Sequence, residues 1–422
     1  MKLKTTKKSY EEVVAIPRKK HKKPLKPNMF FRTLMKVVAQ PDLISTHFTC
    51  RKIGMEKLGK KEPALFLMNH TSFIDLEIAA NLLYPRPFNV VCTSDGFVGK
   101  HWLMRQIGCI PTNKFTSDLR LIRDMTYAIK TLRSSVVMYP EAGYSLDGTT
   151  TTLPETLGAF LKLLGAPVVM IRTYGAFSRN PLYNNLHRRK VPVSADMEYL
   201  LSPEEVKSLS VEELNAVLKK AFDLDYWRWQ QENDVTITET FRAEGLNRVL
   251  YKCPYCGTEG KMSAEGVTLR CDACGITHTL TEEGYLRAEG VETRFPHVPD
   301  WFAWEREEVR KELLASEYKL DIPVDICMMI DAKHVYRIGT GNLTHTAEGF
   351  RLVGCDGKLE YKQSPIASYS VNSDFYWYEI GDIICIGDSK TLYYCFPEQG
   401  VDVVAKTRLA AEELYKIKHV KK

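Results

Sequence analysis

A histidine and an aspartate five residues apart follow an apolar run near residue 70. Residues 64–68 read Ala-Leu-Phe-Leu-Met, and Asn69, His70 and Asp75 come after them. Five consecutive apolar residues predict a short strand buried on both faces, and a helical pattern begins near Ser72. Asp75 can then accept a hydrogen bond from one imidazole nitrogen of His70, which leaves the other nitrogen to take a proton from a hydroxyl. The pair predicts general-base chemistry at the edge of a sheet, with helix capping or a core hydrogen bond as the alternative.

Two further apolar runs continue into motif-like blocks. Residues 136–145 read Val-Val-Met-Tyr-Pro-Glu-Ala-Gly-Tyr-Ser, and residues 165–171 read Gly-Ala-Pro-Val-Val-Met-Ile. With the first block, this ordered set resembles the glycerolipid acyltransferase family, which includes the lysophosphatidate acyltransferases. Asn69-His70 with Asp75 matches the family's His-four residues-Asp motif, and residues 139–141 match its Phe-Pro-Glu-Gly block. The resemblance covers about residues 40–200.

The resemblance implies an activity and a set of site residues. The expected reaction moves a fatty acyl group from acyl-CoA or acyl carrier protein to a lysolipid hydroxyl, by default that of 1-acyl-sn-glycerol-3-phosphate, in phospholipid biosynthesis. His70 would be the general base and Asp75 its orienter. No Gly-x-Ser-x-Gly elbow occurs, so direct attack by the hydroxyl is simpler than an acyl-enzyme. The residues expected at the acceptor are Asn69, Lys114, Glu141, Ala142, Gly143 and Ser145, with the Ala142-Gly143 turn presenting backbone N–H groups.

Three substitutions depart from the family pattern in one direction. Lys114 replaces an arginine, Tyr144 takes the place of another arginine, and Thr156 takes the place of a lysine. Arginine forks bind phosphate in two-pronged fashion, whereas lysine acts only as a point charge. A weaker phosphomonoester pocket is expected unless Arg172 or Arg120 compensates. A different acceptor lipid, or a catalytically weak lipid-binding scaffold, therefore stays open.

Two Cys-x-x-Cys pairs form a separate signal. Cys253 and Cys256 are separated from Cys271 and Cys274 by the fourteen residues 257–270, and each pair is followed by a glycine. This spacing is typical of zinc ribbons, and four thiolates close a tetrahedral site. We expect a structural Zn²⁺ and no catalytic metal; a redox role for the thiols, or no metal, is the alternative.

Composition bounds the class of protein. A chain of 422 residues predicts two or three domains, and its net charge is +6. Of the eleven cysteines, the seven outside the two pairs are scattered among apolar residues, which suits a reducing cytosol. No apolar run reaches about eighteen residues, so any membrane contact should be peripheral. A zinc ribbon with a basic tail also raises nucleic-acid binding, but residues 246–290 are not strongly basic and we expect no nucleic-acid partner.

Changes in pattern along the chain predict five segments. Residues 1–27 form a basic flexible tail, 28–245 an α/β acyltransferase domain with a largely parallel sheet, 246–290 the zinc ribbon, 291–320 a helical linker, and 321–422 a small mostly-β domain with a C-terminal helix that resembles a pleckstrin-homology-like barrel. Within the second segment we expect strands at 65–68, 89–92, 135–139 and 167–172 and helices at 73–83, 118–133 and 155–164.

The N-terminal region also bears on location. Basic residues up to Lys26 precede the amphipathic stretch 29–38, which contains Phe30 and Phe31. This combination predicts an interfacial helix on an anionic membrane surface, with a helix packed on the catalytic core as the alternative. The protein is therefore expected in the cytoplasm, peripheral at the inner face of the cell membrane.

Overall fold

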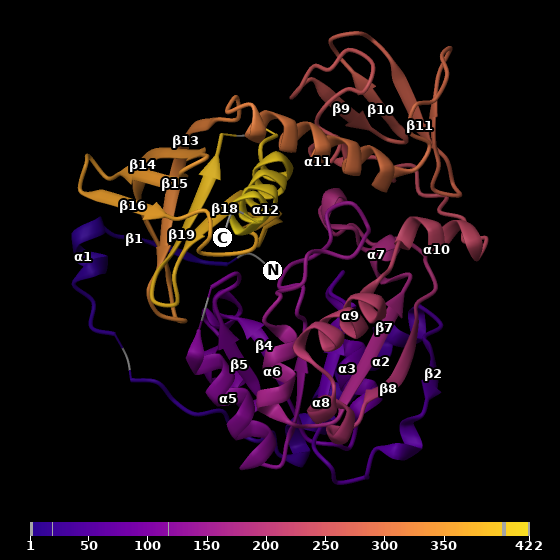
Figure 1. The fold of residues 1–422 in the computed structure, drawn as a ribbon, viewed down its shortest axis with the longest axis vertical. Helices are drawn as coiled ribbons and strands as arrows, with labels where there is room; N and C mark the ends of the chain where they lie inside the picture. Colours follow the sequence, from indigo (N-terminus) through magenta and orange to yellow (C-terminus); the bar gives the residue numbers. More distant parts are fainter. Residues whose placement is uncertain (1–2, 19, 117, 399–401, 421–422) are drawn as a thin grey trace.

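The computed structural model describes residues 3–18, 20–116, 118–398 and 402–420. Figure 1 shows an α/β unit in the lower half, a small all-β unit at the upper right, and a β-rich unit with a helix at the upper left. None of the helices among the described residues has the length and apolar character needed to cross a membrane.

The α/β unit is built on a seven-stranded sheet in the order β2-β8-β7-β3-β6-β4-β5. Five of its six pairings are parallel, and only β7 and β8 run antiparallel. Its central strands come from the apolar runs, because a strand covered on both faces must be apolar throughout. The strands are β2 (Thr49–Ile53), β3 (Leu65–Met68), β4 (Phe88–Thr93), β5 (Cys109–Thr112), β6 (Ser135–Met138), β7 (Val168–Tyr174) and β8 (Ser194–Leu201).

Helices cover both faces of this sheet. Phe66 and Met68 of β3 pack in one core with α2 and α3, whereas Leu65 and Leu67 pack in another with α5, α6 and α9. Side chains alternate across a strand, so one short apolar run supplies both cores. The helices are α2 (Met29–Ser45), α3 (Ile74–Leu83), α4 (His101–Gln106), α5 (Leu119–Lys130), α6 (Leu157–Leu164), α7 (Ala176–Arg179), α8 (Pro203–Ser208), α9 (Val211–Phe222) and α10 (Tyr226–Glu232).

The expected strands and helices of this unit are present, with ends shifted by a few residues. Three strands were not expected: β2, β5 and β8. The strand β2 reads Thr-Cys-Arg-Lys-Ile and lies at the edge of the sheet, where polar residues face water. Its composition therefore gives no apolar signal, and its pairing with β8 decides its structure.

The upper-right unit contains the four predicted zinc cysteines. It is an antiparallel sheet in the order β12-β11-β10-β9, with strands β9 (Met262–Glu265), β10 (Thr268–Cys271), β11 (Thr277–Leu280) and β12 (Leu286–Ala288). The helix α11 (Val298–Leu314) connects this unit to the C-terminal one and buries Trp301 completely.

The C-terminal unit has an antiparallel sheet in the order β16-β15-β14-β13-β19-β18-β17, two meanders joined where β13 pairs with β19, and a helix follows. Seven strands and one C-terminal helix are the elements expected for this β-rich domain; its pleckstrin-homology-like character remains an interpretation. They are β13 (Leu320–Met329), β14 (Val335–Thr346), β15 (Gly349–Gly354), β16 (Leu359–Gln363), β17 (Asn372–Trp377), β18 (Gly381–Gly387), β19 (Leu392–Pro397) and α12 (Val404–Val420).

The N-terminal segment differs from the flexible tail expected for residues 1–27. The strand β1 (Thr5–Lys7) pairs parallel with β14, and the helix α1 (Tyr10–Val14) begins with a capping box between Ser9 and Glu12. Leu3 and Val13 are buried. Figure 1 shows this segment beside the C-terminal sheet before the chain crosses to the α/β unit. Two apolar residues among many lysines are a weak signal in sequence, yet they suffice to anchor a short edge strand.

Candidate active site

His70 and Asp75 meet at the carboxyl edge of the sheet. His70 follows β3, and Asp75 lies in the first turn of α3. The Nδ1 atom of His70 is 3.1 Å from Oδ2 of Asp75, which also accepts hydrogen bonds from the backbone N–H groups of Thr71 and Ser72. These two backbone donors hold the carboxylate in place, so it fixes the orientation of the imidazole ring.

The other imidazole nitrogen of His70 is open. Within the described residues, Nε2 makes no hydrogen bond, and the side chain keeps 21% of its surface exposed. The ring lies between Tyr139 and Tyr144, whose ring centroids are 4.3 and 4.4 Å from its own. Burial lowers the pKa of His70, with the charge of Lys114 acting in the same direction and Asp75 opposing both. A neutral imidazole with one open nitrogen is the form a general base needs.

Glu141 supports this histidine through the backbone. One of its carboxylate oxygens accepts the N–H of His70 at 3.1 Å, and the other accepts the N–H of Thr151 at 2.9 Å. β3 and β6 are neighbours, so the residues after them are brought together. Glu141 is 2% exposed, and burial raises its pKa to about 7. In this structure Glu141 positions the His70 backbone; it is not free to bind an acceptor.

Two other predicted acceptor residues are also structural. Asn69 is 1% exposed, and its side chain exchanges hydrogen bonds with Thr173 of β7. Ser145 is equally buried, donates to the carbonyl of Thr149 and accepts from Gly148. Their polar groups already form hydrogen bonds with neighbouring segments, so the geometry does not support the prediction that they contact the acceptor.

The Ala142-Gly143 turn also differs from the expectation. The N–H of Ala142 donates to the carbonyl of Tyr139, and that of Gly143 donates to the carbonyl of Glu141. Ala142 has a φ of +57°, a left-handed conformation that folds the turn back on itself. Both N–H groups therefore point inward and are not offered to a ligand.

Lys114 is the predicted acceptor residue that stays available. It lies in the loop after β5, is half-buried, and forms no hydrogen bond or ion pair within the described residues. Its charge reaches His70 and Asp374, since it lowers the pKa of both. A free cation beside the base could hold a negative charge on a substrate.

The C-terminal unit supplies residues that the sequence did not point to. Arg408 of α12 is 4% exposed, donates from Nη1 to the carbonyl of Tyr144 at 3.1 Å, and has Nη2 3.6 Å from where a Cβ on Gly143 would stand. Tyr369 donates to the carbonyl of Pro140. Among the described residues the carboxylate of Asp374 in β17 forms no hydrogen bond or ion pair, and burial raises its pKa to about 6. These residues lie more than 220 positions after the Pro-Glu block, so no local signal could have found them.

The two arginines considered as compensating cations lie elsewhere. Arg172 is paired with Glu198 across β7 and β8. Arg120, at the start of α5, contacts Asp118 and the carbonyl of Ser389. Tyr144, in the place of a family arginine, packs on His70 instead. The cation that contacts the turn at residues 142–144 is therefore Arg408 of the C-terminal unit.

The four cysteines of the ribbon converge as the spacing predicts. Their sulfur atoms all lie within 4.8 Å of one another, with 3.7 Å between Cys253 and Cys274 and between Cys256 and Cys271. A tetrahedral zinc with Zn–S bonds of about 2.3 Å needs sulfur atoms roughly 3.8 Å apart. Gly257 and Gly275 adopt φ of +74° and +79°, which the tight turns after each pair require. The residues therefore fit a structural metal ion held by four thiolates.

In comparisons of the whole chain with known proteins, a family model matches the part that contains the motifs. Residues 49–172 match the family model described as Acyltransferase. A solved structure, that of the 1-acyl-sn-glycerophosphate (LPA) acyltransferase PlsC from Thermotoga maritima, is similar at 16% identity and a TM-score of 0.35, over 45% of this chain and 76% of that one. No curated protein sequence matches the chain. The residues that match the Acyltransferase model include His70, Asp75 and Glu141, so the similarity to that family lies in residues 49–172, which hold the candidate active site.

Proposed function

We propose that this protein is a peripheral membrane O-acyltransferase that moves a fatty acyl group from a thioester donor, acyl-CoA or acyl carrier protein, to a lysolipid hydroxyl. The observation that carries the proposal is the geometry of His70, with Nδ1 held by Asp75 and Nε2 open at the carboxyl edge of the sheet. The default acceptor is 1-acyl-sn-glycerol-3-phosphate, as the motif resemblance implies.

The reaction follows from that geometry. Nε2 of His70 takes the proton of the acceptor hydroxyl while its oxygen attacks the thioester carbonyl. The new C–O ester bond forms, the C–S bond breaks, and the thiolate leaves with the proton that His70 returns to it. Asp75 keeps the ring in the required tautomer and stabilises the imidazolium that forms between the two proton transfers. Positive charge on Lys114 favours the negative oxygen that develops on the carbonyl.

Two cations from different domains lie near the candidate site, and of these Arg408 is buried and also contacts Glu412 at 3.4 Å. Lys114 comes from the α/β unit, and Arg408 comes from α12. Arg408 also lines a cavity of about 700 Å³ whose walls include Leu153, Phe302 and Leu409. A guanidinium in the lining of a partly apolar cavity suits an anionic head group with an acyl chain. In this proposal Arg408 of the C-terminal domain supplies the positive charge that is lost where Tyr144 takes the place of a family arginine.

A different acceptor has one specific observation in its favour. Asp374 faces the same region as Lys114 and Arg408, because both cations lower its pKa. A carboxylate near the head group disfavours a phosphate dianion and favours a neutral or zwitterionic acceptor. Acceptor identity is therefore the first question for the assay.

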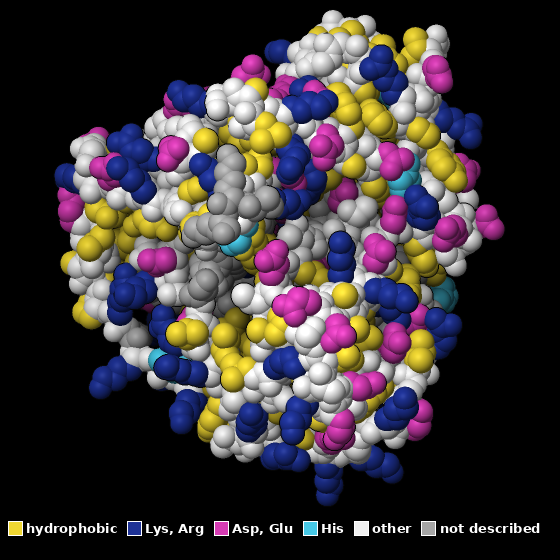
Figure 2. Space-filling model, in the orientation of Figure 1, with side chains coloured by type: hydrophobic (Ala, Val, Ile, Leu, Met, Phe, Trp, Pro, Cys, Tyr) yellow, Lys and Arg dark blue, Asp and Glu magenta, His cyan; other side chains and the backbone are white. Residues whose placement is uncertain are grey.

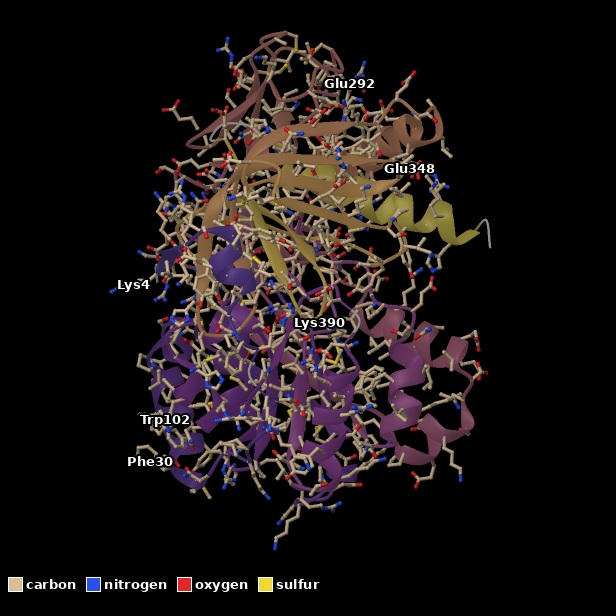
Figure 3. All side chains as sticks on the ribbon, turned by 90° about the vertical axis from the view of Figure 1, so that its left-hand side faces the viewer. Lys4, Phe30, Trp102, Glu292, Glu348 and Lys390 are labelled. Carbon is tan, nitrogen blue, oxygen red and sulfur yellow. The ribbon has the colours of Figure 1, made fainter. Side chains whose placement is uncertain are left out.

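The exposed face of α2 supports membrane contact. Met29, Phe30, Leu34, Val37 and Val38 are exposed on this helix, and Trp102 of α4 is exposed beside it, with its ring 5.9 Å from that of Phe31. Figure 3 shows Phe30 and Trp102 close together at the lower end of the molecule. Figure 2 shows many Lys and Arg side chains along the same lower end. Apolar side chains with basic neighbours are the composition of an interfacial anchor.

The proposal is tested by acyl transfer from acyl-CoA and acyl carrier protein to a panel of lysolipids, with products read by mass spectrometry. With a phosphate-bearing acceptor, Arg408→Gln should raise KM about tenfold or more and change kcat much less, because a charged hydrogen bond to phosphate is lost. The KM of Arg408→Gln for a neutral monoacylglycerol should equal that of wild type. Arg310→Gln is the matched control. Arg310 of α11 pairs with Glu413 of α12, the helix that carries Arg408, but away from the turn. No acyl transfer to any acceptor would refute the function, and an unchanged KM would refute the role of Arg408.

A further inference from the structure

A second cavity lies at the junction of three parts of the chain. Its volume is about 520 Å³, and its lining includes Arg18 of the N-terminal segment, His101 and Arg120 of the α/β unit, and Lys333 and Lys390 of the C-terminal unit. Figure 3 shows Lys390 between the C-terminal strands and the α/β unit. None of these residues belongs to the acyltransferase motifs.

The charge of this cavity is not compensated. Four cationic side chains line it against one carboxylate, that of Asp331. Asp331 accepts the backbone N–H groups of Lys333 and His334, so it already holds its own loop. Within the described residues, the ammonium groups of Lys333 and Lys390 form no ion pair.

The two arginines of the cavity are held in place chiefly by neutral groups. Arg18 donates to the carbonyl of Lys390 and to the hydroxyl of Thr391. Arg120 donates to the carbonyl of Ser389 and has one longer contact, 3.4 Å, with Asp118. These contacts fix both guanidinium groups; the charge of Arg18 meets only neutral partners, whereas Arg120 is also paired with Asp118. Several cations around one open cavity attract a ligand with several negative charges.

The cavity shares an edge of the sheet with the catalytic residues. His70 follows β3, and Arg120 follows β5 after the loop that begins at Asn113; the strand order β3-β6-β4-β5 separates them by three strand spacings, or about 14 Å. Within that loop Asn113 donates to the carbonyl of Asp388, beside Ser389 and Lys390, while Lys114 acts on His70. A long, flexible substrate can therefore occupy both places at once.

We propose that this cavity binds the phosphate groups of a coenzyme A thioester, through Arg18, Arg120, Lys333 and Lys390. Its nucleotide carries three phosphate groups, and the extended pantetheine arm is long enough to bring the thioester to His70. The inference rests on the proposed function and deepens it, because it selects acyl-CoA over acyl carrier protein as the donor.

The test measures binding of 3′-phosphoadenosine 5′-diphosphate to the full-length protein by isothermal titration calorimetry at low salt. Lys333→Gln with Lys390→Gln should weaken binding at least tenfold, and raised salt should weaken wild-type binding too. The matched control is Lys60→Gln with Lys61→Gln, which removes two exposed lysines near the start of β3, at the opposite edge of the sheet. Equal affinity of wild type and the Lys333/Lys390 variant would overturn the proposal.

Further ligands separate the possible sources of phosphate. Adenosine diphosphate and pyrophosphate should bind more weakly than the full nucleotide, and vesicles with anionic lipid should not compete for it. Pyrophosphate binding as tight as that of the nucleotide, or competition by vesicles, would overturn the assignment to coenzyme A.

Kinetics separate this inference from the proposed function. In the Lys333/Lys390 variant KM for acyl-CoA should rise at least tenfold with kcat unchanged, and KM for an acyl-pantetheine donor should not change. Nucleotide binding by a protein without acyl transfer would refute the proposed function alone. Acyl transfer from acyl-CoA with no nucleotide binding would refute the cavity's role alone.

Discussion

At the scale of residues, two carboxylates act on His70 in different ways. Asp75 holds the imidazole at Nδ1, whereas Glu141 holds the backbone N–H of the same residue. The first sets the tautomer of the ring, and the second sets where β3 ends relative to β6. A base with both its ring and its backbone fixed loses little freedom when it meets a hydroxyl.

Replacing Glu141 tests the second of these contacts. Glu141→Gln leaves one acceptor oxygen where two are needed, for His70 N–H and for Thr151 N–H. We expect the free energy of unfolding to fall by about 1–3 kcal/mol and kcat to fall about tenfold or more, measured by denaturant titration and by initial rates. Glu56→Gln, at an exposed position, should change neither. An unaltered kcat would show that Glu141 does not position the base.

The same variant has a pH signature. The folded state raises the pKa of Glu141 from 4.5 to about 7, so it binds a proton that the unfolded chain has released. This contribution to stability is present below pH 4.5 and is lost as the pH rises toward 7. The difference in stability between wild type and Glu141→Gln should therefore shift in favour of the variant over that range.

Sequence reasoning found the residues whose chemistry depends on local spacing. His70 with Asp75 lies within one strand-helix junction, and the zinc cysteines lie within two tight turns, so their separation along the chain fixes their geometry. Arg408, Tyr369 and Asp374 reach the site only through packing of a distant domain. The N–H groups of Ala142 and Gly143 donate within their own turn, because the direction of an N–H depends on a local φ that sequence does not state.

At the scale of elements, burial decided what could be predicted. β3 is apolar throughout, and β6 and β7 contain the apolar runs 136–138 and 168–171, because helices cover both faces; each was expected. β1 and β2 are short polar strands at sheet edges, defined by their partners β14 and β8. Edge strands carry little apolar signal, so their pairing partners must be known before they can be recognised.

The ribbon provides the prediction at this scale. Protein purified without chelator should contain about one zinc per chain, and Cys271→Ser should lower the free energy of unfolding by several kcal/mol, since zinc binding and ribbon folding are coupled. Cys50→Ser is the matched control, because Cys50 is a half-buried free cysteine of β2 outside the cluster. Metal analysis and calorimetric unfolding provide the measurements. Zinc-free protein with an unchanged unfolding profile would exclude a structural metal.

At the scale of the whole molecule, the C-terminal domain is part of the site. Asp95, which follows β4, is buried and accepts hydrogen bonds from Trp377, Tyr378 and Tyr394 of that domain. With the contacts of Tyr369 and Arg408, these bonds hold the domain over the carboxyl edge of the sheet. The domain boundaries expected from sequence place residues 28–245 and 321–422 in separate domains, whereas both contribute residues around His70.

Membrane binding belongs to the same scale. Phe31 is buried, so the exposed pair is Phe30 with Trp102, not Phe30 with Phe31. Phe30→Ser with Trp102→Ser should remove most flotation on vesicles containing anionic lipid, because burying these side chains is worth several kcal/mol. Leu163→Ser with Val291→Ser, two exposed apolar residues elsewhere, should float like wild type. Equal flotation of all three proteins would place the anchor elsewhere.

Raised salt should weaken wild-type flotation without abolishing it. Each basic side chain near an anionic surface contributes about 1 kcal/mol, and that attraction decays over a Debye length of roughly 8 Å at physiological salt. The apolar contribution of α2 and Trp102 is not screened.

The central claim is that His70 is the general base of acyl transfer, and its removal tests that claim most directly. The measurement is the rate of ester formation by His70→Ala from acyl-CoA and the best acceptor of the panel, with the melting temperature followed in parallel. Loss of the base predicts a rate about a hundredfold to ten-thousandfold below wild type at a nearly unchanged melting temperature, with Asp75→Asn less severe. A rate within about threefold of wild type would contradict the mechanism.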